Sequence, residues 1–134
     1  QNSHVLPALL KKFHDAKINN IENVIVWGSG KPKREFLHVD DLAESVLFCL
    51  RTNHSESLLN VSGQDYLSIK QLSILIKKVT NFSGKIFFNK KYPDGVKERK
   101  LDDKKLSKLG WKSKIKLEYG LKSYYEYFKS LELK

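Results

Sequence analysis

The chain has 134 residues, 40% of them hydrophobic, which is the size of one ordinary domain with a core of its own. No run of about 18 apolar residues occurs, so the sequence predicts no membrane span and no membrane partner. The formal net charge of +10 invites a nucleic-acid interpretation, but only three of the 25 basic residues are arginines, so we expect a solvated lysine surface and no nucleic-acid partner.

The first predicted elements are a helix and a short strand. Apolar residues recur at helical spacing over 3–17, which predicts an amphipathic helix. The β-branched run at 24–26 predicts a buried strand, and Gly28 and Gly30 predict that the strand stops at a turn.

A second strand and a capped helix are expected next. Residues 34–39 are typical of a strand in which His38 alternates with apolar neighbours and packs rather than reacts. Asp41 and Glu44 have the spacing of a capping box, so we expect a helix to begin there. Cys49 is the only cysteine and cannot form an internal disulfide, and we expect it on a buried helix face in a reducing, cytoplasmic setting.

The second half of the chain continues the alternation of strands and helices. We expect a strand at 58–61, a helix at 68–82 with a Ser68/Gln71 capping box and a stop at Gly84, a strand at 85–89, a turn at 92–95, a helix at 101–109 that ends at Gly110, and a helix at 117–131. This alternation predicts an α/β fold of short strands and amphipathic helices, with residues 1–134 in a single domain.

Several patterns resemble catalytic motifs, but the residues around them or their expected chance frequency argue against a catalytic role. The Gly28-Ser29-Gly30 run lacks the third glycine and the following helix of a dinucleotide-binding turn, so we do not expect a cofactor loop there. Tyr66 with Lys70, and Tyr125 with Lys129, have Y-x-x-x-K spacing, but a chain this rich in tyrosine and lysine contains about one such match by chance. The histidines and the cysteine are scattered, so no metal site is predicted.

Two residues stand out by their chemistry. Arg34 is a lone arginine beside a glycine turn and can bind a phosphate bidentately, although an ordinary salt bridge explains it equally well. His4 lies at the start of the first predicted helix, where the helix dipole makes a polar group useful to a site. A surface histidine in a frayed terminus is the alternative for His4.

Five motifs occur together and carry a resemblance. They are N-S-H-V-L-P-A-L-L at 2–10, V-W-G-S-G at 26–30, R-E-F-L-H-V-D-D-L-A at 34–43, P-D-G at 93–95 and L-G-W at 109–111. In this order they closely resemble the C-terminal, substrate-binding part of the GDP-L-fucose synthases, a family of extended short-chain dehydrogenases/reductases. The R-E-F run is shared more loosely by many nucleotide-sugar epimerases and dehydratases, whereas the first two motifs are more particular.

The resemblance implies an enzyme that epimerises GDP-4-keto-6-deoxy-D-mannose at C3 and C5 and reduces C4 with a hydride from NADPH. The histidine of the first motif, here His4, is a proton donor in that family and lies beside the nicotinamide. A histidine suits this role because its pKa lies near the working pH. The cysteine that assists in the family is not matched by Cys49.

The family's substrate-binding residues carry over to Lys12, Trp27, Arg34, Lys85 and Arg99. Lys12 stands where the family usually has an arginine, so a point charge replaces a bidentate fork. Arg34 is expected near the diphosphate. Tyr92 stands where the family commonly has a lysine, and no role is assigned to it.

The resemblance also implies what these residues lack. The family's glycine-rich Rossmann part and its Ser, Tyr and Lys catalytic set would precede Gln1, so we expect NADPH to bind mainly there and this chain alone to be inactive. The full-length enzyme is expected to be a cytoplasmic homodimer. Two alternatives stay open: another nucleotide-sugar epimerase or dehydratase of the same superfamily, and a basic module that binds anions or nucleic acid without catalysis.

Overall fold

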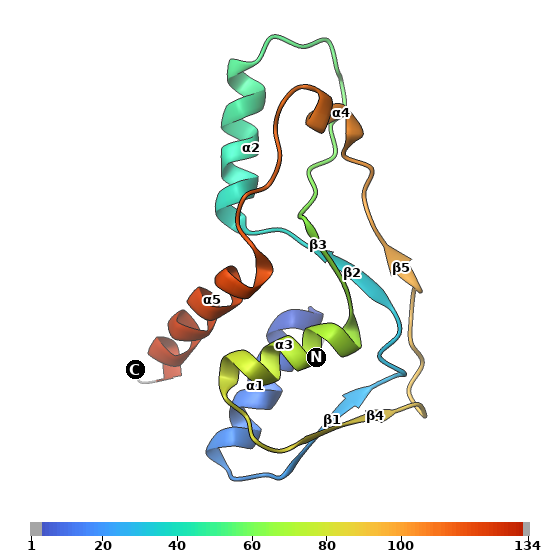
Figure 1. Cartoon of the computed structure of the whole chain (residues 1–134), viewed down its shortest axis with the longest axis vertical. Coiled ribbons are helices and arrows are strands. Elements are labelled where there is room, and N and C mark those ends of the chain that lie inside the picture. The colour runs from blue at the N-terminus through green and yellow to red at the C-terminus, as the bar shows by residue number, and fades with distance from the viewer. Residues whose placement is uncertain (1–3, 133–134) are drawn as a thin grey trace.

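The computed structural model describes residues 4–132. Its elements in chain order are α1 (Val5–Ile18), β1 (Asn23–Trp27), β2 (Lys33–Phe36), α2 (Val39–Arg51), β3 (Asp65–Ser68), α3 (Ile69–Thr80), β4 (Lys85–Asn89), β5 (Glu98–Arg99), α4 (Lys104–Lys108) and α5 (Leu117–Glu132). Figure 1 shows an elongated arrangement in which α1, α3, α5, β1 and β4 lie together at one end and α2 and α4 lie at the other. The expected α/β fold is confirmed.

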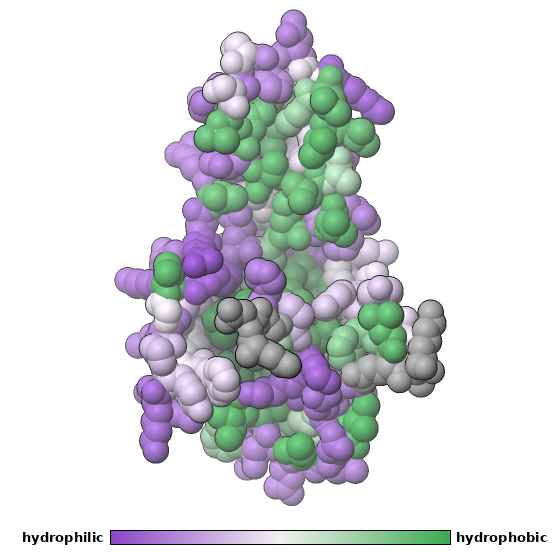
Figure 2. Space-filling view, turned by 180° about the vertical axis from the view of Figure 1, so that it is seen from behind, coloured by the Kyte–Doolittle hydropathy of each residue, from purple (hydrophilic) through white to green (hydrophobic). Residues whose placement is uncertain are grey.

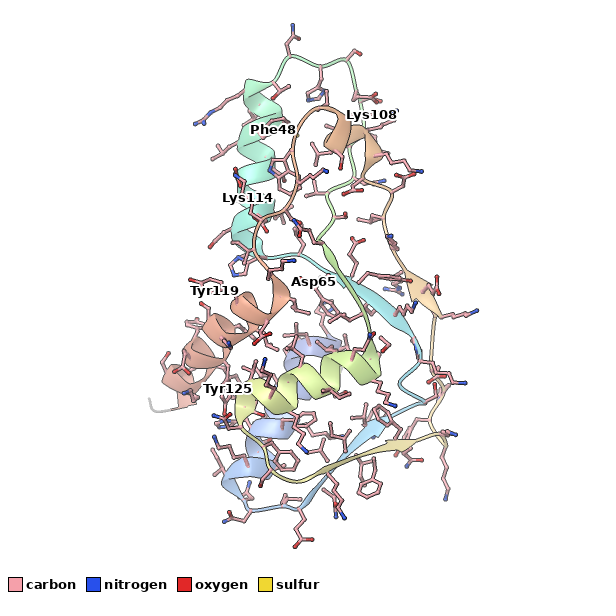
Figure 3. The ribbon with its side chains drawn as sticks, in the orientation of Figure 1. Phe48, Asp65, Lys108, Lys114, Tyr119 and Tyr125 are labelled. Atoms are coloured by element: carbon pink, nitrogen blue, oxygen red, sulfur yellow. The ribbon has the colours of Figure 1, made fainter. Side chains whose placement is uncertain are left out.

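The hydrophobic core lies among α1, β1, α3 and α5. Apolar residues at helical spacing give each of these helices a buried face, as with Leu10 and Phe13 on α1 and Leu72 and Ile76 on α3, all fully buried. α5 adds Tyr125, whose hydroxyl lies 3.0 Å from the Nδ1 atom of His14 inside this core (Figure 3). The polar contact and the packing together join α1 to α5.

Two parallel strand pairs and the loops between them connect the core end of the molecule to its middle. β1 pairs with β4 and β2 pairs with β5, both in parallel, while β3 pairs with β2 in the antiparallel sense. The loops at 28–32 and 90–97 therefore lead from one pair to the next in the same direction. Gly28 has a φ of 85°, and a Cβ there would lie 2.5 Å from the Asp94 carboxylate. Glycine at this position allows the two loops to approach.

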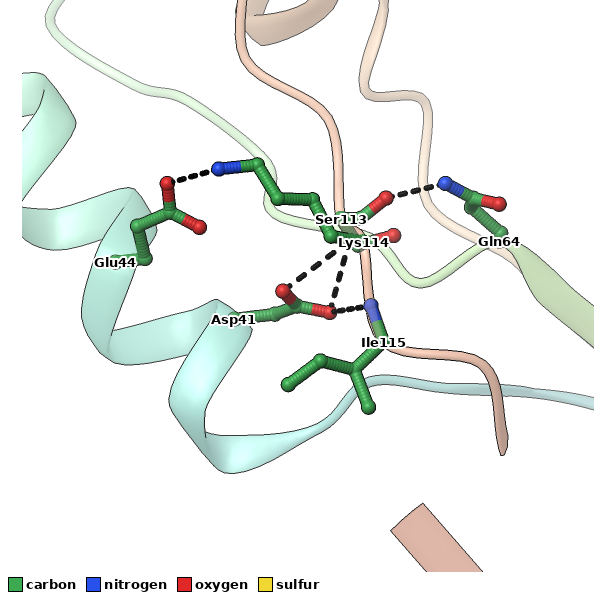
Figure 4. Close-up of polar contacts among 6 residues, drawn as sticks. All are labelled: Asp41, Glu44, Gln64, Ser113, Lys114 and Ile115. Atoms are coloured by element: carbon green, nitrogen blue, oxygen red, sulfur yellow. Dashed lines mark hydrogen bonds and ion pairs between the residues drawn. The ribbon is translucent and has the colours of Figure 1, made fainter. Parts of the chain in front are cut away.

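α2 is attached to the rest of the chain through a buried carboxylate. Asp41 is 2% exposed and accepts hydrogen bonds from the backbone N–H groups of Lys114 (3.1 Å) and Ile115 (2.9 Å), as Figure 4 shows. The Lys114 ammonium also forms an ion pair with Glu44, at 2.5 Å. One turn of α2 thus holds the segment that leads into α5.

Another face of α2 is apolar and exposed. It carries large apolar side chains, which we call the α2 apolar face: Val39, Leu42, Val46, Leu47 and Leu50. Figure 2 shows apolar side chains gathered on the upper half of the molecule. Leu58, in the loop after α2, is 72% exposed as well.

Most predicted elements are confirmed. Helices occupy 5–17 of the expected 3–17, most of 68–82 and all of 117–131, and strands contain 24–26 and 85–89. The Ser68/Gln71 capping box is present with both of its hydrogen bonds. Gly110 follows α4 with a φ of 106°, as expected for a glycine just after a helix.

Some predictions of local structure are wrong. The segment 58–61 is not a strand, and β3 and β5 form instead, because strands exist only where a partner pairs with them and β2 pairs with both. α4 is shorter than the expected 101–109. α3 ends at Asn81, which adopts a left-handed conformation with a φ of 53°, rather than at Gly84.

The start of α2 also differs from the prediction. His38 is not in a strand but is the N-cap residue of α2, and its Nδ1 atom accepts the N–H of Asp40 at 3.2 Å. Asp41 does not cap the helix, because its carboxylate turns to the 114–115 backbone. Cys49 is half-buried rather than buried.

Candidate functional site

An exposed aromatic pair lies at the C-terminal end of β1. The rings of Trp27 and Tyr92 are stacked, with centroids 4.6 Å apart and an interplanar angle of 14°. The Lys12 ammonium, which reaches over from α1, lies 5.3 Å from the Trp27 centroid, within cation–π range. The structure therefore brings Lys12 and Trp27 together and adds Tyr92, which sequence reasoning missed.

Lys12 also covers the open edge of β1. Its Nζ atom donates to the carbonyl of Ile25 at 2.7 Å. The carbonyl of Glu22 and the N–H of Gly28 both bond to the β4 side, so the alternation of the strand directs the Ile25 carbonyl away from β4. An ammonium has three donors, so Lys12 keeps two for a ligand.

A carboxylate ties the loop after β1 to the loop after β4. Asp94 accepts the backbone N–H of Ser29 at 2.5 Å and its hydroxyl at 2.6 Å. These hydrogen bonds from Ser29, the hydroxyl first, hold the pKa of the Asp94 carboxyl below its usual value. The P-D-G turn thus fixes the glycine turn beside the aromatic pair.

Besides Lys12, a pair of arginines carries positive charge where β2 pairs with β5. Arg34 and Arg99 are direct register partners on these parallel strands, so their side chains leave the same face of the sheet. Like charges directly opposite one another are destabilising unless an anion or a counter-charge lies between them. Arg34 donates from Nη1 to the carbonyl of the preceding residue, Lys33, at 2.7 Å.

Tyr66 on β3 lies on the other face of this sheet, because it is the register partner of Glu35, the neighbour of Arg34 on β2. The ammonium groups of Lys33 and Lys100 each lie 5.4 Å from its ring centroid. Burial, followed by the effect of the nearby Glu98 carboxylate, raises the pKa of the Tyr66 hydroxyl. Sequence reasoning missed this cluster, although the charge run at 97–100 next to a predicted turn was the available signal.

Lys85 lies apart from the other candidate residues. It is the first residue of β4 and pairs with Asn23, whereas Trp27 pairs with Asn89 at the other end of the same two strands. Lys85 instead lines an open groove between α3 and β4, together with Lys70 and Phe87. The structure does not bring Lys85 to the aromatic pair.

His4 is exposed and is the N-cap residue of α1. α1 connects to β1 through only four residues, so the two elements run in opposite directions and the N-terminus of α1 lies toward the Trp27 end of β1. Eight residues of helix, about 12 Å along the axis, separate His4 from Lys12. His4 thus lies at the same end of the molecule as the aromatic pair, two turns beyond Lys12.

Within residues 4–132, no group of three or more His, Cys, Asp or Glu side chains could hold a metal ion. No helix in that part of the chain is long and apolar enough to cross a membrane. The glycine turn at 28–30 does not fit a cofactor diphosphate, because it leads into β2 rather than a helix and faces the Asp94 carboxylate. The turn at 28–30 is therefore not a dinucleotide-binding turn.

Residues 1–62 match the NAD dependent epimerase/dehydratase family. This match and the alternating helices and short strands make the chain similar to proteins with the short-chain dehydrogenase/reductase fold. The resemblance to extended short-chain dehydrogenases/reductases that the five motifs carry is confirmed.

Individual similar proteins give a more specific comparison than the family match does. GDP-L-fucose synthase 1 of Arabidopsis thaliana is 43% identical over 128 residues, which cover 96% of this chain and 40% of the relative. The GDP-L-fucose synthetase of Naegleria fowleri bound to NADP superposes with a TM-score of 0.87 at 29% identity, over 98% of this chain and 41% of that one. The GDP-mannoheptose C4 reductase of Campylobacter jejuni with NADP bound has a TM-score of 0.83 at 35% identity, over 95% and 45%.

The chain is homologous to the GDP-L-fucose synthases and aligns with their C-terminal part. It spans about two fifths of the length of the curated relatives it matches.

Proposed function

We propose that this chain supplies GDP-sugar binding and the epimerisation acid of an NADPH-dependent epimerase/reductase that converts GDP-4-keto-6-deoxy-D-mannose to GDP-L-fucose. Homology to the GDP-L-fucose synthases supports the reaction. The observation that carries the site is the contact of the Lys12 ammonium with the Trp27 ring at the end of β1. A cation beside an exposed aromatic surface suits a nucleotide, which has both a ring and phosphates.

The arginine pair supports diphosphate binding. An anion between Arg34 and Arg99 would relieve the repulsion of two guanidinium groups on neighbouring strands, and each guanidinium can hold phosphate oxygens bidentately. Lys12 would add a point charge from α1. The geometry supports Lys85 less well as a substrate-binding residue, because it lies at the far end of β4.

His4 is proposed as the acid of the epimerisation. The reaction removes a proton at C3 and at C5 and returns one to the opposite face of each carbon, so it needs a group that exchanges protons near neutral pH. An exposed histidine at the first turn of α1 is accessible to a substrate held by Lys12 and Trp27. C4 reduction needs a different acid, which these residues do not supply.

NADPH is proposed to bind mainly outside residues 1–134, with His4 beside the nicotinamide. The poor fit of the 28–30 turn to a cofactor diphosphate supports this division. The whole enzyme would act as both isomerase and oxidoreductase, as a homodimer in the cytoplasm.

The test uses the intact enzyme with GDP-4-keto-6-deoxy-D-mannose in deuterated water. We expect His4→Asn to slow deuterium incorporation at C3 and C5 by about 10²- to 10⁴-fold, as for a lost general acid, while reduction of an already epimerised substrate changes much less. His54→Asn, in the loop after α2, is the matched control and should behave as wild type. Deuterium incorporation at the wild-type rate in His4→Asn would return His4 to a purely structural position.

A second candidate is C4 reduction of another GDP-sugar without epimerisation. It is favoured by the match to the GDP-mannoheptose C4 reductase at 35% identity. The same experiment separates the two, because a reductase alone oxidises NADPH without incorporating deuterium at C3 or C5.

A further inference from the structure

Tyr92 and Trp27 form an aromatic surface that stays exposed in the described fold, although the Lys12 ammonium approaches the Trp27 ring. Trp27 is 64% exposed and Tyr92 is 43% exposed, although they are stacked on each other. The other aromatic pairs among the described residues are edge-to-face contacts within or against the core, such as Phe13 with Phe82. An exposed stacked pair offers a flat apolar surface on which a further ring can stack.

The backbone on both sides of Tyr92 is held by hydrogen bonds. Its own N–H donates to the carbonyl of Asn89 at 3.3 Å, and the N–H of Lys91 donates to the Asn89 side chain at 3.0 Å. Two residues beyond Tyr92, Asp94 binds Ser29 through two hydrogen bonds. The ring is therefore presented by a fixed turn, which lowers the entropic cost of stacking a further ring on it.

Charge around the pair is arranged for a ligand with a ring at one end and an anion at the other. Lys12 approaches the Trp27 ring, and its ammonium has donors to spare. The basic pair Arg34 and Arg99 lies on β2 and β5, just after the loop that follows Trp27 and the loop that carries Tyr92. Along the chain from β1 to β2, Trp27 is therefore followed by Arg34, and along the chain from β4 to β5, Tyr92 is followed by Arg99.

We propose that Tyr92 is a specificity-determining residue of the nucleotide site: its ring, backed by Trp27, stacks against the purine of the nucleoside diphosphate. This inference rests on the proposed function and deepens it, since it assigns the base to Tyr92 and leaves the phosphates to the basic side chains. Stacking favours the larger purine over a pyrimidine, so the pair selects for the base as well as binding it.

The test measures dissociation constants of GDP and of inorganic pyrophosphate for the intact enzyme by calorimetry. We expect Tyr92→Ala to weaken GDP binding by roughly five- to a hundredfold, the usual effect of removing one base-stacking ring. Tyr92→Phe should keep GDP binding, because the ring and not the hydroxyl stacks. Pyrophosphate binding should be unchanged in both variants, which a general distortion of the loop would not produce.

Tyr119→Ala, an exposed tyrosine on α5, is the matched control and should bind GDP as wild type does. Equal dissociation constants of GDP for the wild type and Tyr92→Ala would overturn the stacking role. A loss of pyrophosphate binding in Tyr92→Ala as large as the loss of GDP binding would overturn it too. A wild-type enzyme that binds no GDP overturns the proposed function together with this inference, whereas normal turnover with an unaffected Tyr92→Ala overturns the inference alone.

Discussion

Asp41 is the residue on which the position of α2 most depends. Its carboxylate is buried and accepts backbone N–H groups from a segment more than seventy positions further along the chain. Hydrogen bonds to a charged acceptor are stronger than neutral ones, and buried donors that lose their acceptor carry the full cost of desolvation. A single side chain therefore fixes the entry into α5.

We expect Asp41→Asn to lower the free energy of unfolding by about 1–3 kcal/mol, because the amide offers one weaker acceptor and turns an N–H₂ group toward other donors. Urea denaturation measures this change. Glu44→Gln is the matched control in the same helix turn; its ion pair with Lys114 is exposed, so a loss of less than about 1 kcal/mol is expected. Equal losses in the two variants would contradict the role of burial at Asp41.

At the residue scale, the structure brings some of the named candidate residues together and separates others. Lys12 and Trp27 were named separately as substrate residues, and they lie together. Lys85 was named with them but lies at the other end of β4, and only the strand register, which no local pattern reports, could have shown this. Tyr92 was given no role because its importance comes from the ring stacked on it, 65 positions earlier in the sequence.

Among the elements, helices were predicted better than strands. The α3 capping box depends on residues three positions apart, so the sequence alone is enough to predict it. The two-residue strand β5 and the four-residue strand β3 exist because β2 lies between them, and their own composition is uninformative. The expected strand at 58–61 has suitable residues but no pairing partner among the described residues.

The loops at 28–32 and 90–97 behave as one element because Asp94 links them. The folded state lowers the Asp94 pKa, so the link is fully present above the ordinary aspartate pKa and is lost as the pH falls through the lowered value. We expect the amide resonance of Ser29 to shift with a midpoint below about 3.9 in an acid titration followed by nuclear magnetic resonance.

Asp94→Asn supplies the control for that titration, since it removes the titrating group and should leave the Ser29 resonance independent of acid pH. A wild-type midpoint at or above the ordinary aspartate value would show that the Asp94 carboxylate does not hold Ser29 in solution.

The whole molecule has a core at one end and the candidate site in the middle. Apolar spacing in α1 and α3 was sufficient to predict the core. The parallel pairing of β1 with β4, about 60 positions apart, was not predictable from local patterns, yet this pairing brings Trp27 beside the loop that carries Tyr92, and the pairing of β2 with β5 sets Arg34 opposite Arg99. The site is therefore a product of topology more than of any one motif.

A polypeptide of residues 1–134 alone should not oxidise NADPH with the GDP-sugar. The reason is that the glycine turn at 28–30 joins two strands and faces a carboxylate, so this turn does not provide the strand–turn–helix that holds a cofactor diphosphate. Absorbance of NADPH during incubation with substrate measures this, and the intact enzyme is the positive control. Turnover by the 134-residue polypeptide would refute the division of labour proposed above.

The α2 apolar face affects how long a polypeptide of residues 1–134 would persist in a cell. Chaperones and proteases act on exposed apolar stretches, and five large apolar side chains in thirteen residues of one helix form such a stretch. The lysine-rich surface does not shield it, because charge elsewhere does not cover an apolar helix face. How long these residues persist when synthesised alone would then be decided by cellular quality control at α2, and not by the chemistry at Trp27.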